Sequence, residues 1–177
     1  MIKNREDFLE LLDRGHIDIE ALAVDELDQA FEYLNKMMLG VYHFVLNYND
    51  YINTRHCYTE EEALTTLEAH LLTDICDIPD STVTNLANSW NRSVSATSQT
   101  IRKLIQKDLI TRENSKNDAK IFYLRPTEKG ICVSNAHKRY DTLDIIKTLK
   151  RLRHSLTMEE IDAMLKGLDA FTELLKK

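Results

Sequence analysis

Glycine, proline and long apolar runs are scarce in this sequence. Its 177 residues include four Gly and two Pro, fewer than turn-rich β architectures require, so the composition favours helices. No run of about 18 apolar residues occurs, which argues against a membrane-spanning helix. The first fifteen residues mix acids and bases without an apolar signal core, so we expect a cytoplasmic protein.

Paired cysteines are also missing. Cys57, Cys76 and Cys132 form no CxxC pair, and an odd, scattered set fits reduced thiols better than a disulfide framework. A redox-active thiol needs an electropositive, partly exposed setting. Cys76 and Cys132 have apolar neighbours in the sequence, so Cys57, beside Arg55 and His56, is the candidate for such a role.

Positive charge is scarce overall but concentrated in one segment. The formal net charge is −6. Residues 1–70 contain five bases and fifteen acids, whereas residues 92–125 contain eight bases and three acids. A nucleic acid responds to the local patch, because charges are screened over about 10 Å at moderate salt. This distribution favours nucleic-acid binding by residues 92–125.

Apolar periodicity predicts helices on both sides of the basic segment. A short helix is expected in residues 1–20, and a long one from Asp18 or Asp25 to about Asn53. The apolar stripe of the long helix is wider than one small core needs, so part of it could face a second subunit. Residues 56–62 are interpreted as a polar connection. Three further helices are expected after Thr65, Thr127 and Thr157, the first and last opened by capping boxes with Glu68 and Glu160.

Residues 82–107 predict a helix-turn-helix. A short helix from Thr82 to Trp90 is followed by a turn, and Ser93 or Ser95 caps a second helix that reaches about Lys107. The outer face of the second helix carries small polar residues and then basic ones, which allow close approach to the DNA major groove. The candidate DNA contacts on these helices are Thr82, Ser93, Ser95, Ala96, Ser98, Gln99, Arg102 and Lys103.

A β-hairpin is predicted directly after the second helix. Residues 109–112 and 121–124 have strand-like patterns, and residues 115–118 have turn chemistry. A hairpin in this position is a wing, whose tip suits phosphates or the minor groove. Its candidate DNA contacts are Arg112, Lys116, Asn117 and Lys120. The expected fold class is mainly α with a small β-hairpin wing, as a winged helix-turn-helix lobe with terminal helices.

The order of these motifs resembles the MarR family of multiple-antibiotic-resistance-type regulators. The similar segments, in chain order, are Leu64-Thr65 (the family's LT start), residues 82–104 (its T-x-x-x-LA segment and Ser-rich recognition helix), 109–120 (its wing), 126–130 (its LTEKG) and 156–160 (its LTxEE). Asp108 stands where the family usually has a Gly that ends the recognition helix. In the wing, Asp118-Ala119-Lys120 replaces the usual D-x-R, which removes the bidentate fork of Arg.

The resemblance implies a transcription regulator that acts as a homodimer on palindromic double-stranded DNA, most simply as a repressor. An effector would change the spacing of the two winged lobes and hence the DNA affinity. The implied domains are an N-terminal extension helix (1–20), a dimerisation helix (21–58), the winged helix-turn-helix domain (59–130) and C-terminal dimerisation helices (131–177).

Two kinds of effector remain open. His137 and Asp141 lie four residues apart on one predicted helix and share a face. The resemblance to the zinc-sensing branch of the family implies a metal site of His70, His137, Asp141 and Asp50, and two imidazoles with two carboxylates suit zinc. The alternative is a small apolar or phenolic ligand in a cleft between the dimer helices and the lobe. Residues such as Met38, Tyr42 and Tyr48 would line that cleft.

Familiar catalytic motifs do not occur. The sequence has no G-x-S-x-G elbow, P-loop, HExxH helix or Rossmann glycine pattern, so we do not expect an enzyme. Two alternative classes remain, a metal-binding helical interaction protein and an enzyme whose metal supports hydrolysis. The basic segment of residues 92–125 argues against the interaction protein, which would not need it. A closed four-ligand metal site would indicate sensing, whereas an open coordination position would indicate catalysis.

Overall fold

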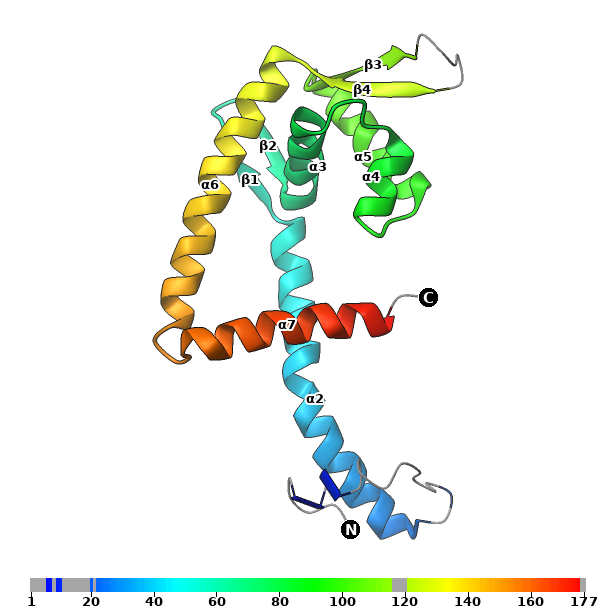
Figure 1. Cartoon of the computed structure of the whole chain (residues 1–177), viewed down its shortest axis with the longest axis vertical. Helices are drawn as coiled ribbons and strands as arrows, with labels where there is room; N and C mark the ends of the chain where they lie inside the picture. Colours follow the sequence, from blue (N-terminus) through cyan, green and yellow to red (C-terminus); the bar gives the residue numbers. More distant parts are fainter. Residues whose placement is uncertain (1–5, 8, 11–19, 21, 116–120, 176–177) are drawn as a thin grey trace. The chain divides into compact units, whose positions relative to one another are not determined.

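A computed structural model describes residues 6–7, 9–10, 20, 22–115 and 121–175 (Figure 1). The chain divides into two compact units, Met1–Thr54 and Arg55–Lys177. The predicted wing-tip contacts Lys116, Asn117 and Lys120 lie outside the described residues, as does most of the predicted helix in residues 1–20. The finer division into four domains stays a prediction.

The first unit contains the long helix α2, Val24–Asn53. It begins beside Asp25, the later of the two predicted starts, with Glu26 also in its first turn. Acidic residues there stabilise a helix because its N-terminus carries partial positive charge. Many of the large apolar side chains of α2 are exposed in the single chain, including Phe31 at 66% and Leu46 at 66%. The wide apolar stripe expected from the sequence is therefore present.

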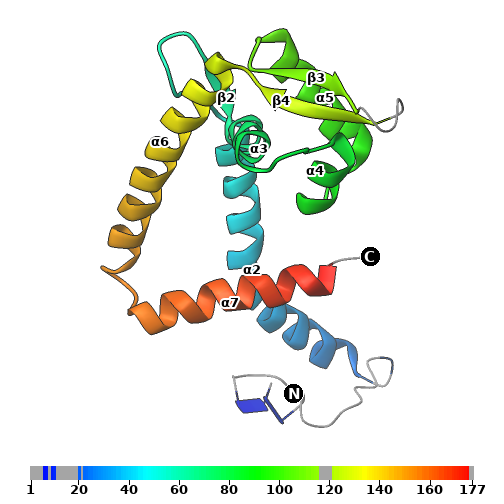
Figure 2. The same cartoon turned by 45° about the horizontal axis from the view of Figure 1, so that its top comes forward.

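The second unit is built around α3, Thr66–Asp77, which lies between α6 and the α4–α5 pair (Figures 1 and 2). Thr65 caps α3, and the predicted capping box with Glu68 is present: the Thr65 side chain accepts from the Glu68 N–H, and the Glu68 carboxylate accepts from the Thr65 N–H. The core around α3 is formed by buried side chains from each of these helices and from the hairpin that follows, among them Leu71, Leu72, Leu86, Ile101, Leu104, Leu109, Leu124 and Val133.

The helix-turn-helix consists of α4, Val83–Ser89, and α5, Val94–Gln106. Thr82 caps α4, and Ser93 rather than Ser95 caps α5. Asn91 in the turn adopts φ of 47°, a conformation that Asn tolerates better than most residues. The inner face of α5 is packed through Thr97, Ile101 and Leu104, whereas Val94 in the first turn is 50% exposed.

The wing follows α5 as an antiparallel pair of β3, Ile110–Asn114, and β4, Phe122–Pro126, with Arg112 opposite Leu124. Asp108, just after α5, adopts φ of 57°, so Asp takes the left-handed position where Gly is the easier residue. Leu124 donates its backbone N–H to the Ser81 carbonyl at 2.9 Å, which ties β4 to the segment before α4.

The segment before α3 contains a second, smaller hairpin. β1, Arg55–Cys57, pairs antiparallel with β2, Ala63–Thr65. The interpretation of residues 56–62 as only a polar connection was therefore incomplete. Strands of three residues are too short for a period-two pattern to stand out in the sequence.

Two helices complete the second unit. α6, Glu128–Leu152, begins at the cap Thr127, and α7, Met158–Leu175, begins after the predicted capping box of Thr157 and Glu160. In α7 Ile161 is buried, whereas the large apolar side chains after it, among them Leu165 and Phe171, are exposed in the single chain. None of the helices in the described part of the chain has the length and apolar content needed to cross a membrane.

Candidate DNA-binding face and candidate metal centre

The outer face of α5 presents the predicted base-reading residues. Ser95, Gln99 and Arg102 are exposed, and Ala96 and Ser98 are half-buried between them. The opposite face of α5 is packed into the core through Thr97, Thr100, Ile101 and Leu104. The helix is thus anchored on one side and displays small polar and basic groups on the other, as a recognition helix in the major groove requires.

The two predicted capping residues have different surroundings. Ser93 is exposed and Thr82 is half-buried, and each uses its side-chain oxygen to accept a backbone N–H. Thr82 also lines a cavity of about 430 Å³ between α4 and the wing, together with Arg112. Two predicted DNA contacts from separate elements therefore border one opening.

Part of the positive charge in residues 92–125 is neutralised within the chain. Lys107 and Lys103 pair with acids from earlier segments, and Arg125 pairs with two carboxylates. Within the described residues, Arg102 and Arg112 are exposed and form no ion pair. The count of eight bases therefore overstated the positive charge available to DNA. Arg102 and Arg112 become stronger candidates for DNA contacts than the bases that form ion pairs.

Arg125 connects the two strands of the wing to the segment before α4. Its guanidinium donates to Asp80 at 2.6 Å and to Glu113 at 2.7 Å, and it lies 5.3 Å from the ring centroid of Tyr123. Hydrogen bonds to Glu113 and Asp80 raise the pKa of Arg125 above its ordinary value. This bridge joins both strands of the wing to the turn before α4.

A buried carboxylate joins the end of α5 to the start of α6. Glu62 accepts hydrogen bonds from Lys107 and Lys129, both at 2.7 Å. Lys129 also donates to the backbone carbonyl of Lys107 at 3.2 Å. Burial raises the pKa of Glu62, but the hydrogen bonds from the two ammonium groups outweigh it and hold that pKa below its ordinary value. Sequence reasoning missed this cluster because its members are far apart in the chain.

A second buried carboxylate links α3 to the recognition helix. Glu68 is 3% exposed, and its Oε1 lies 3.6 Å from the Nζ of Lys103. The Lys103 side chain is itself 58% exposed, so it reaches from the surface toward Glu68. The predicted DNA contact Lys103 therefore forms an ion pair with Glu68 of α3 while most of its side chain stays exposed on the outer face of α5.

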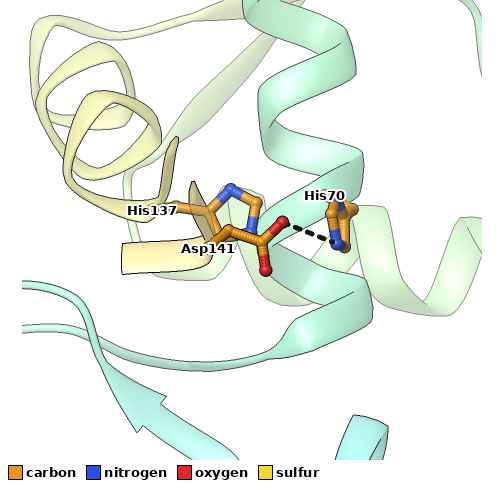
Figure 3. Close-up of side chains that lie close together, drawn as sticks. All are labelled: His70, His137 and Asp141. Carbon is orange, nitrogen blue, oxygen red and sulfur yellow. Dashed lines mark ion pairs between the residues drawn. The ribbon is translucent and has the colours of Figure 1, made fainter. Parts of the chain in front are cut away.

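Three of the four predicted metal ligands come together between α3 and α6. The ligand atoms of His70, His137 and Asp141 all lie within 4.8 Å of one another (Figure 3). The Nε2 of His70 is 3.9 Å from Oδ2 of Asp141, and the two imidazole rings meet edge to face with centroids 4.7 Å apart. The fourth predicted ligand, Asp50, belongs to α2 in the other unit, so its participation stays a prediction.

The environment of His137 keeps its ring neutral. The residue is 2% exposed, and the ring of Tyr58 meets it edge to face at 5.1 Å. Burial, and then the neighbouring His70, lower the pKa of His137 to about 4. Burial also raises the pKa of Tyr58 to about 12. A neutral imidazole is the form that binds a metal ion.

The residues present fit a zinc ion. Buried side-chain nitrogen atoms usually have a hydrogen-bond partner, yet Nε2 of His137 has none within the described part of the chain. Tetrahedral zinc with bonds near 2.0–2.1 Å brings its ligand atoms to roughly 3.3 Å apart, so modest side-chain rotation would close the observed group. Two imidazoles and a carboxylate are a donor set that zinc takes.

The exposure of the three cysteines agrees with expectation for Cys57 and Cys76 but not for Cys132. Cys57 is exposed, as a reactive thiol requires, and burial raises the pKa of the half-buried Cys76. Cys132 is also exposed, so its apolar sequence neighbours do not enclose it. It faces outward because the neighbouring Val133 and Ser134 occupy the inner side of α6.

The depressed pKa of His137 predicts a pH-dependent stability. Between its unfolded value of 6.5 and its folded value of about 4, the unfolded chain binds a proton that the folded chain does not, so stability falls as the pH is lowered. In metal-free protein, unfolding should become easier by about 1 kcal/mol between pH 7.5 and 5.5. Urea denaturation of the wild type and His137→Gln measures this, and an equal pH dependence in both would contradict the assignment.

These features define a winged helix-turn-helix protein, and its central segment matches a known family. Residues 64–122 match the model of the MarR family, so the resemblance inferred from the sequence is confirmed for this part of the chain. A search of curated protein sequences found no match.

Solved structures of MarR family proteins share the fold. The adhesin competence repressor AdcR from Streptococcus pyogenes is 21% identical, covering 81% of this chain and 98% of its own, with a TM-score of 0.58. FabT from Streptococcus pneumoniae, solved in complex with DNA, is 22% identical and covers 82% and 96%, with a TM-score of 0.57. The zinc-responsive ZitR from Lactococcus lactis is 22% identical and covers 84% and 98%, with a TM-score of 0.55.

Proposed function

We propose that this chain is a cytoplasmic, non-enzymatic transcription regulator that binds a palindromic DNA site as a homodimer, represses transcription and responds to zinc. The observation that carries the DNA-binding part is the outer face of α5, where Gln99 and Arg102 are exposed above a buried inner face. Gln and Arg are side chains that make bidentate contacts to adenine and guanine. The structure of FabT with DNA supports this use of the fold.

The homodimer is supported by apolar surface that the single chain leaves uncovered. In α7, Leu165 is 48% exposed, Phe171 40% and Leu174 80%. Several large apolar side chains exposed on one helix favour an interface with a partner. A two-fold dimer would present two copies of α5 to two half-sites, which explains the proposed palindrome.

Zinc is favoured over an organic effector by the unpartnered Nε2 of His137 beside His70 and Asp141. The zinc-responsive ZitR and an AdcR structure solved in its Zn(II)-bound state share the fold. A bound ion would hold α3 and α6 together through these three side chains. Since α3 also contacts Lys103 of the recognition helix through Glu68, the ion could change how α5 meets DNA. Asp50 is the proposed fourth ligand.

The decisive experiment selects bound duplexes from a genomic pool with and without zinc, and then measures affinity for the selected site. Zinc should change that affinity by about 5–150-fold, the usual size of an allosteric coupling. His137→Ala and Asp141→Asn should remove the zinc effect, while the exposed His154→Ala serves as the matched control. Protein that holds no stoichiometric zinc after zinc-replete preparation, with DNA binding unchanged in His137→Ala, would reject zinc sensing. A phenolic ligand that alters affinity without metal would support the alternative effector.

A further inference from the structure

Two hydroxyl groups, those of the half-buried Thr73 and the buried Ser134, lie behind the imidazole of His137. The Oγ1 of Thr73 lies 3.0 Å from Nδ1 of His137. The hydroxyl of Ser134 donates to that same Thr73 oxygen at 3.1 Å. Thr73 belongs to α3, whereas Ser134 and His137 lie one turn apart on α6. Ser134 is 1% exposed and His137 is 2% exposed, so water has little access to this chain of polar atoms.

The two ring nitrogens of His137 therefore have opposite surroundings. Nδ1 has a hydroxyl oxygen in hydrogen-bonding range, while Nε2 is buried and has no hydrogen-bond partner among the described residues. A neutral imidazole carries one N–H, and the hydrogen bond at one nitrogen decides which nitrogen keeps a lone pair. A threonine hydroxyl has two acceptor lone pairs, so Thr73 can accept from Ser134 and from His137 together.

We propose that Thr73, oriented by Ser134, positions His137 for metal binding by accepting a hydrogen bond from the N–H at Nδ1, which leaves the lone pair on Nε2 for a divalent cation. This inference rests on the proposed zinc site and adds to it the residues that select the tautomer. The opposite tautomer would bury an N–H at Nε2 and could not bind the ion through that atom. The ring of His137 lies beside Asp141 and His70 (Figure 3), so Nε2 is the atom available to an ion there.

The hydroxyl pair also connects the two helices that supply the ligands. His70 and Thr73 are three residues apart on α3, and Ser134 and His137 are three residues apart on α6, so each pair shares a helix face. Residues that fix a ligating imidazole from behind typically change metal affinity by about 10–100-fold when removed. Thr73 and Ser134 are positioning residues here, since neither offers a ligand in the observed group.

The test removes the Thr73 hydroxyl while keeping its shape. Thr73→Val should weaken zinc binding, measured by competition with a chelating indicator, by about 10–100-fold, and Thr73→Ser should restore most of it. Thr100→Val is the matched control, because Thr100 is buried in α5 and its hydroxyl donates to its own helix. Long-range ¹H–¹⁵N spectra of histidine-labelled protein identify the proton-bearing nitrogen of His137. We expect it to be Nδ1 in wild type, with and without zinc, and a mixture of tautomers in metal-free Thr73→Val.

The outcomes separate this inference from the proposed function. Wild-type protein with the proton on Nε2, or Thr73→Val with wild-type zinc affinity and tautomer, would overturn the role of Thr73. Absence of zinc binding by the wild type would reject the proposed sensor, and the tautomer would still be read in metal-free protein. Circular dichroism and the Thr73→Ser variant distinguish a lost hydrogen bond from a lost fold.

Discussion

Replacing Gln99 and Arg102 together with Ala should weaken binding to the selected DNA site by about 2–6 kcal/mol, or roughly 30-fold to more than 10⁴-fold. Each bidentate base contact contributes about 1–3 kcal/mol of discrimination, and we expect the two side chains to contact different bases. Both side chains are exposed on the same face of α5, in its first three turns. Quantitative gel-shift or anisotropy titration at fixed salt measures the loss.

Three further variants separate base reading from charge. Gln106→Ala alters an exposed glutamine at the C-terminal end of α5 and should leave binding nearly unchanged. Arg102→Lys keeps the charge but loses the fork, so specificity should fall while the salt dependence stays. Lys103→Ala should weaken binding to all sequences and reduce the salt slope by about one unit. Unaltered affinity and specificity in the double variant would show that α5 is not the reading helix.

Helix starts could be predicted because their causes are local. Thr65, Thr82, Thr127 and Thr157 each precede a helix, and each is observed as the residue where a helix begins. A cap needs one side-chain oxygen and the N–H groups two or three residues later, so the relevant information lies within four residues. The left-handed end of α5 at Asp108 was instead an implication of the family resemblance, since the family usually has a Gly at this position.

Ion pairs over long sequence separations could not be predicted in this way. Glu62 meets Lys107 and Lys129, which follow it by 45 and 67 residues, and no pattern in the sequence joins them. The pairing of Arg125 with Asp80 spans another 45 residues. Counting bases along the chain therefore assigned several positive charges to the predicted DNA-binding patch. In the structure these charges form ion pairs within the chain.

The candidate metal site combines a feature that local spacing predicts with contacts between residues far apart in the sequence. Spacing alone placed His137 and Asp141 on one helix face, whereas the meeting of His70 with them was an implication of the family resemblance. Thr73 and Ser134 were missed, although a signal for them exists in the sequence. Each lies three residues from a predicted histidine ligand on the same helix, where a hydroxyl can reach that ligand's neighbourhood.

Gly130→Ala should destabilise the fold by about 3–4 kcal/mol, because no space exists for the added methyl group. A Cβ built at Gly130 would lie 2.0 Å from the backbone oxygen of Leu109. The same oxygen accepts the backbone N–H of Thr127 at 3.1 Å, and the Thr127 hydroxyl donates to the Asp108 carbonyl at 2.8 Å. The first turn of α6 is therefore fastened to the end of α5 by backbone atoms that cannot rotate away.

This junction connects the helix with the predicted metal ligands His137 and Asp141 to the end of the helix with the predicted DNA contacts Gln99 and Arg102. Thermal or urea unfolding of Gly130→Ala should show the loss, with Gly40→Ala and Gly167→Ala as controls. In the single chain a Cβ at either control site meets nothing within 4 Å, so Ala there should stabilise its helix by up to about 1 kcal/mol. Wild-type stability in Gly130→Ala would mean that α6 does not approach Leu109 this closely.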